Sequence, residues 1–158
     1  MSHAEQLARF ETAQGFIAAL DQSGGSTPKA LAQYGVDPSQ YSGDAQMFDL
    51  IHAARTRVIT SPAFTSDRII AAILFEGTLE RQVEGRSTVD YLWSVKGILP
   101  FLKIDKGLAE RAGGVQLMRD IPGLDDTLAH AAAQGVVGTK ERSVIHAADP
   151  DGIARIVD

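Results

Sequence analysis

Four short apolar runs, each followed by polar or turn-forming residues, stand out along the chain. They predict β-strands at residues 16–21, 69–75, 98–105 and 136–142. Each run is almost entirely apolar before it turns polar, which is typical of strands covered on both faces, as in a parallel sheet. Pro100 interrupts the third run, and because proline has no N–H to donate, we expect it at the strand's entry.

Segments with helical spacing alternate with these runs. They cover residues 28–34, 45–59, 88–95 and 124–134, and a last segment opens at 149–150 and continues to Asp158. The expected N-caps are Thr27, Asp44 and Ser87, and the expected C-terminal stops are Gly35, Gly97 and Gly135.

The alternation of strands and helices predicts an α/β fold with right-handed crossovers. Four βα units in 158 residues scale to roughly 300 residues for eight units, within the range of a (β/α)8 TIM barrel. The pattern therefore predicts that residues 1–158 form the N-terminal half of a single barrel, with about its first four βα units.

Composition excludes several classes of protein. The net charge is −5 and no lysine or arginine run occurs, which argues against a nucleic-acid partner. The absence of cysteine excludes disulfides and thiolate metal sites. No apolar window of about 18 residues indicates a membrane span, and the first residues contain no apolar signal core. We therefore expect a cytoplasmic protein with no membrane partner.

Charged residues gather at the ends of the predicted strands, where the catalytic groups of a barrel lie. Because side chains alternate along a strand, Lys103 and Asp105 share one face, as do Lys140 and Arg142. Together with Asp21 at the end of the first predicted strand, these groups suit an anionic substrate. They also suit amine chemistry, since a lysine beside another cation has a lowered pKa and attacks carbonyls more readily. Ordinary charges at strand ends remain the alternative.

The loop DQSGGSTPK at residues 21–29 has the outline of a phosphate site. Its glycines let the backbone approach a ligand, Ser23 and Ser26 offer hydroxyls, and a predicted helix begins directly afterwards. A flexible Gly-Ser loop followed by a helix cap explains the same residues equally well.

Metal ligation is not indicated anywhere along the chain. The four histidines show no ligand spacing, and Asp125 and Asp126 read as favourable charge at a helix start. We therefore expect no metal and no other cofactor.

Four motifs resemble the class I fructose-1,6-bisphosphate aldolases. FIAALDQSGGSTPKAL is similar to the family's first strand and phosphate loop, and AAILFEGTLER to its second strand. GILPFLKIDKGL is similar to the lysine-bearing third strand, and GTKERSVI to the fourth. The resemblance covers nearly the whole chain in the right order and is closest to the bacterial branch.

The resemblance implies roles for six residues. Asp21 would handle the proton of the substrate C4 hydroxyl during cleavage. Lys140 would stand beside the Schiff-base lysine, keep that amine neutral and take part in carbinolamine steps. The remaining four would bind the C6 phosphate: Ser23, Ser26, Lys103 and Arg142.

Some positions depart from the family or receive no role. Lys29 and Asp105 match family positions near the site without a fixed role, and Glu76-Gly77 replaces the His-Glu pair of the animal enzymes. The family's Schiff-base lysine lies on the sixth strand, a key glutamate on the fifth and the C1-phosphate loops on the seventh and eighth. None of these falls within residues 1–158, so we expect this chain alone to be inactive.

The implied activity is a metal-free lyase reaction of glycolysis and gluconeogenesis in a homo-oligomer. A lysine Schiff base would cleave fructose 1,6-bisphosphate to dihydroxyacetone phosphate and glyceraldehyde 3-phosphate. Two alternatives stay open. Lys140 could itself form the Schiff base, as in some aldolases and transaldolases, or the chain could be a half-barrel that binds sugar phosphates without catalysis.

Overall fold

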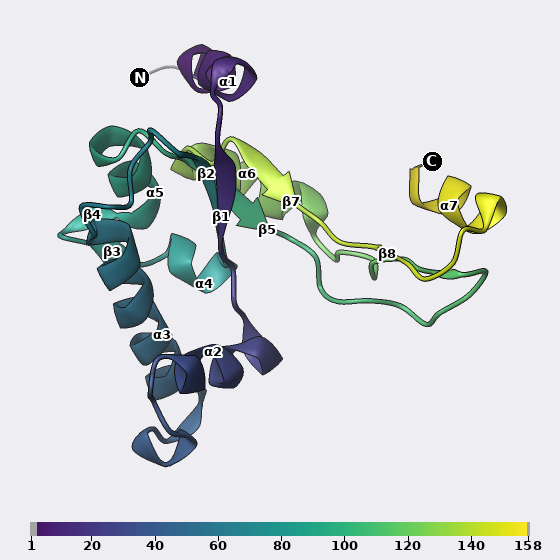
Figure 1. Cartoon of the computed structure of the whole chain (residues 1–158), viewed down its shortest axis with the longest axis horizontal. Helices are drawn as coiled ribbons and strands as arrows, with labels where there is room; N and C mark the ends of the chain where they lie inside the picture. The colour runs from purple at the N-terminus through teal and green to yellow at the C-terminus, as the bar shows by residue number, and fades with distance from the viewer. Residues whose placement is uncertain (1–2, 158) are drawn as a thin grey trace.

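The computed structural model describes residues 3–157 and is built on one four-stranded parallel sheet. Its strands follow one another in chain order as β1 (Phe16–Leu20), β2 (Ile69–Leu74), β5 (Leu99–Lys103) and β7 (Gly138–Lys140) (Figure 1). All four predicted strands are confirmed, and each is one to four residues shorter than its predicted range. The arrangement is an arc of a (β/α)8 barrel, as the pattern predicted.

Helices alternate with these strands. The longer ones are α1 (His3–Thr12), α2 (Thr27–Gln33), α3 (Gly43–Thr60), α6 (Leu124–Gln134) and α7 (Pro150–Val157). The short ones are η1 (Gly24–Ser26), η2 (Pro38–Gln40), α4 (Glu76–Leu79), α5 (Thr88–Asp90) and η3 (Tyr91–Val95), a π-helical turn. Two small antiparallel ribbons complete the fold: β3 (Gln82–Val83) with β4 (Arg86–Ser87), and β6 (Val115–Gln116) with β8 (Val144–Ile145).

The two faces of the sheet have different surroundings because side chains alternate along each strand. One face packs against α3, η3 and α6 through buried residues that include Leu74, Leu102, Ile59, Leu92 and Ala131. The other face carries the opposite set, in which Ala19, Ile73, Phe101 and Gly138 stand side by side in register. Lys103 and Lys140 are the last partners on that second face.

Helix starts differ in detail from the pattern. Ser87 caps α5 as predicted, because its side chain accepts the Asp90 N–H at 3.1 Å. The predicted caps Thr27 and Asp44 are wrong, since Ser26 and Ser42 occupy the N-cap positions of α2 and α3. Asp44 instead lies in the first turn, where a carboxylate still interacts favourably with the helix dipole.

Helix α1 was not predicted, and the tertiary structure explains what holds it. The Phe10 ring lies 5.5 Å from the Phe101 ring of β5, and Arg9 donates to the Ser66 carbonyl at 2.6 Å. Figure 1 shows α1 at the amino end of β1, with α2 beyond its carboxyl end. The last helix ends at Val157, and Asp158 lies outside the described residues.

No helix within residues 3–157 combines the length and apolar character needed to cross a membrane.

Candidate functional site

A cavity of about 700 Å³ opens at the carboxyl ends of the four parallel strands. The loop after β1, the start of α4 and the residues after β5 and β7 form its walls. All six predicted site residues line it: Asp21, Ser23, Ser26, Lys103, Lys140 and Arg142. The sequence pattern therefore located one common pocket, while the role of each residue stays a prediction.

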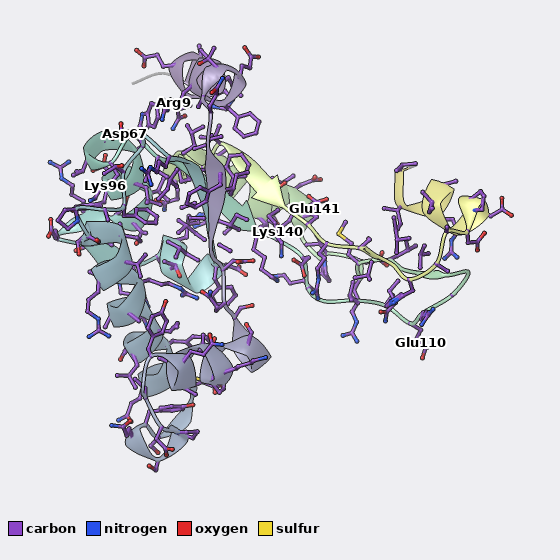
Figure 2. The ribbon with its side chains drawn as sticks, viewed as in Figure 1. Arg9, Asp67, Lys96, Glu110, Lys140 and Glu141 are labelled. Carbon is purple, nitrogen blue, oxygen red and sulfur yellow. The ribbon has the colours of Figure 1, made fainter. Side chains whose placement is uncertain are left out.

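Lys140 connects two of the acidic groups of this cavity, Asp21 and Asp105. Its Nζ lies 3.3 Å from Asp21 Oδ2 and 3.5 Å from Asp105 Oδ2. Figure 2 labels Lys140 at the end of β7, followed by Glu141, which accepts from the Thr139 hydroxyl at 3.1 Å. Because alternate residues face opposite ways, Lys140 belongs to the cavity face and Thr139 to the other. One ion pair, between Lys140 and Asp21, thus joins the end of β7 to the end of β1.

Asp105 is the buried acid of the cavity, with only 2% of its side chain exposed. Lys103 Nζ lies 3.2 Å from its Oδ2 and donates to its backbone carbonyl at 2.8 Å. Burial alone would raise the pKa of Asp105. The two neighbouring lysines and a hydrogen bond from the Gly107 N–H outweigh burial and lower that pKa. Asp105 therefore stays ionised and holds Lys103 and Lys140 together.

The charge balance of the cavity favours an anion. Three cationic groups, Lys103, Lys140 and Arg142, face two carboxylates, Asp21 and Asp105. The further pair of Lys106 and Glu76, 2.9 Å apart, is neutral as a unit. One positive charge remains in excess. Arg142 is the most exposed of the three cations, and it lines the cavity where a ligand could reach it first.

The loop after β1 forms a closed turn at the cavity wall. The Ser23 N–H donates to Ser26 Oγ at 3.1 Å, and the Ser26 hydroxyl donates back to the Ser23 carbonyl at 3.1 Å. The Ser26 N–H also donates to that carbonyl at 3.1 Å. These bonds fix the two serines relative to each other beside Asp21.

Sequence reasoning noted Asp105 without giving it a role, and it did not single out Arg55 or Thr78. Arg55 is buried on α3 directly behind the loop after β1, and Thr78 is its partner on α4. No local signal marks either residue, because both are polar residues within helical segments.

The histidines take no part in the cavity. His52 bonds to the Gln82 carbonyl, His130 lies 2.7 Å from Glu80, and His146 bonds to the Gln116 side chain. Within the described part of the chain, no group of three or more His, Cys, Asp or Glu side chains could hold a metal ion.

A sequence model of the family "Fructose-bisphosphate aldolase class-I" matches residues 3–153. The chain is 59% identical over 154 residues to fructose-bisphosphate aldolase class 1 of Synechocystis sp., covering 98% of this chain and 51% of that protein. The chain thus spans about half the length of this curated relative.

A solved structure supports the fold. It is a ternary co-crystal structure of fructose-bisphosphate aldolase from Plasmodium falciparum in complex with TRAP and a small-molecule inhibitor. The two chains superpose with a TM-score of 0.65 at 24% sequence identity, over 89% of this chain and 40% of that chain. At this identity, the similarity is one of fold alone.

Proposed function

The chain belongs to the class-I fructose-bisphosphate aldolase family, and we propose that it supplies half of the active site for cleavage of fructose 1,6-bisphosphate. The observation that carries this proposal is the position of Lys140 Nζ between Asp21 and Asp105, in a cavity with excess positive charge. Such a cavity suits a bisphosphate and a lysine-assisted carbonyl reaction.

The chemistry starts from a lysine amine that condenses with the substrate ketone and releases water. The protonated imine then accepts the electron pair of the breaking C3–C4 bond. Asp21 takes the C4 hydroxyl proton as glyceraldehyde 3-phosphate leaves, and dihydroxyacetone phosphate remains as the enamine. We assign the Schiff-base amine to a lysine outside residues 1–158. The Lys140 ammonium lowers the pKa of that amine by charge repulsion.

The C6 phosphate binds at the wall formed by the loop after β1. Ser23 and Ser26 supply hydroxyl groups, while Lys103 and Arg142 supply positive charge. Neither a metal nor another cofactor is required in this scheme. We further propose that the protein works in the cytoplasm as a homo-oligomer, without nucleic-acid or membrane partners, in keeping with its acidic net charge of −5.

Trapping with borohydride and dihydroxyacetone phosphate tests this proposal. We expect covalent label on the protein at its full natural length and none on residues 1–158 alone, because none of the lysines in this range is the expected nucleophile. Label on the short chain that disappears in Lys140→Met would identify Lys140 as the nucleophile instead. Lys96→Met is the matched control, since Lys96 Nζ binds the Ser61 carbonyl away from the cavity. A full-length protein that takes no label contradicts the proposed function.

A further inference from the structure

A buried guanidinium lies behind the cavity and has no role in the chemistry above. Arg55 of α3 is 4% exposed. Its Nη1 donates to the hydroxyl of the fully buried Thr78 at 2.7 Å, and its Nη2 donates to the Gln22 carbonyl. Its Nε has no hydrogen-bond partner among the described residues. Burying a charge against neutral acceptors costs free energy, so packing alone does not explain this side chain.

The bond to Gln22 sets the direction of one peptide group. A trans peptide is planar, so its C=O and N–H point to opposite sides. With the Gln22 carbonyl held toward Arg55, the Ser23 N–H faces the other way. There it donates to Ser26 Oγ at 3.1 Å, the bond that begins the closed turn. Arg55 thus orients, through one peptide plane, both serines that line the cavity.

The charge of Arg55 also reaches Asp21. Burial lowers the pKa of Arg55 to about 10, against the opposing effect of the Asp21 carboxylate and together with repulsion from Arg81. Arg55 therefore remains protonated at neutral pH. Arg55 does not line the main cavity. It lines a smaller one of about 320 Å³ beside it, and the two cavities share Phe48, Phe75 and Glu76. It acts from behind the wall and leaves the substrate volume free.

We propose that Arg55 is a positioning residue that aims Ser23 and Ser26 at the C6 phosphate of the substrate, with Thr78 fixing its guanidinium from the far side. This inference rests on the proposed function. It assigns phosphate selectivity to a side chain that touches no substrate.

Kinetics of Arg55→Met and Arg55→Lys in the protein at its natural length test the proposal. Two substrates are compared: fructose 1,6-bisphosphate, and fructose 1-phosphate, which lacks the C6 phosphate. We expect Arg55→Met to lower kcat/KM for the bisphosphate about tenfold, mainly through KM, the loss expected for one misplaced charge-assisted phosphate contact. The value for fructose 1-phosphate should change less than about twofold, since that substrate makes no use of the serine turn. The kcat/KM of Arg55→Lys for the bisphosphate should lie between those of the wild type and Arg55→Met. Lysine keeps the charge but lacks the two separate NH2 groups with which the guanidinium reaches both acceptors.

The exposed Arg57 on the same helix provides the control. Arg57→Met should leave kcat/KM unchanged for both substrates. Equal losses for the two substrates in Arg55→Met would overturn the proposal, because they would mean a general structural effect or one on Asp21.

A second pair of variants covers the case in which Arg55→Met does not fold. Thr78→Val removes the acceptor of Arg55 Nη1, whereas Thr78→Ser keeps the hydroxyl. We expect the loss of bisphosphate selectivity in Thr78→Val and its rescue in Thr78→Ser. If the wild-type protein is active and the ratio of kcat/KM for the two substrates is unchanged in all of these variants, the positioning role is refuted while the proposed function stands. A wild-type protein that cleaves neither substrate refutes the proposed function, and this inference falls with it.

Discussion

At the scale of single residues, the site depends on one buried carboxylate that serves two ammonium groups. Asp105 lies 3.2 Å from Lys103 Nζ and 3.5 Å from Lys140 Nζ, and only 2% of its side chain is exposed. Without it, two positive charges would stand side by side in register on neighbouring strands. Asp105 therefore stabilises the arrangement that the proposed chemistry requires.

We expect Asp105→Asn to reduce the free energy of unfolding by about 3 kcal/mol at pH 7, because Lys103 loses its buried counter-charge and Lys140 keeps only its ion pair with Asp21. The folded pKa of Asp105 lies below the unfolded value of about 3.9. Its stabilisation is thus present above about pH 4 and is lost as the pH falls through the lowered folded pKa. The difference in free energy of unfolding between wild type and variant, measured by urea titration, should therefore become smaller below pH 4.

The exposed Asp67, labelled in Figure 2, offers a comparison substitution, and Asp67→Asn should change stability by less than about 0.5 kcal/mol. A gap between wild type and Asp105→Asn that stays constant from pH 7 to pH 3 would show that the carboxylate charge is not what stabilises the site.

At the scale of elements, two helix starts differ in how their serines are used. Ser87 begins α5 with a side-chain bond to the Asp90 N–H. Ser42 begins α3 without such a bond, and its own N–H donates to the Gln46 side chain instead. A serine at the N-cap position thus stabilises α5 through its side chain but does not do so for α3.

We expect Ser87→Ala to lower the free energy of unfolding by about 1 kcal/mol, the usual cost of losing an N-cap side chain. Ser42→Ala is the matched control and should cost no more than a few tenths of a kcal/mol. Thermal or urea unfolding of the two variants measures the difference. Equal losses would mean that the Ser87 bond adds nothing to α5.

At the scale of the whole molecule, the start of β1 and the neighbouring helix α1 expose apolar side chains. Phe16 and Ile17 of β1 are 57% and 41% exposed, and Leu7 and Phe10 of α1 are 44% and 43% exposed. β1 is also an outer strand of the sheet, with one edge unpaired within residues 3–157. Exposed apolar residues on an open strand edge favour association with other chains.

Residues 1–158, expressed alone, should therefore self-associate, with an apparent mass that rises with concentration in light scattering or sedimentation. Ile17→Lys places a charge on this surface and should reduce the association. Gln14→Lys, at an exposed polar position just before β1, should not. A monodisperse monomer at all concentrations would contradict this expectation.

The order of the sheet and the location of the cavity follow directly from the amino-acid pattern. Apolar runs such as residues 69–75 are long enough only for strands, and their alternation with helical segments requires parallel pairing. The period of two places Lys103 with Asp105, and parallel strands bring all the charged ends to one edge. For these reasons the pocket with Asp21 and Lys140 could be predicted without coordinates.

The burial of Arg55 and the position of α1 depend on long-range contacts, which the local sequence pattern does not encode. On α3, Arg55 stands four residues after the buried Ile51, where a helical pattern alone leaves open whether an arginine is solvated. Its burial depends on where α4 and the loop after β1 meet α3, and residues distant in sequence set that geometry. The same holds for α1, which is fixed by the contact of Phe10 with Phe101. Local periodicity thus encodes which residues form strands and which way they face, whereas charge pairing and burial depend on distant segments that only folding brings together.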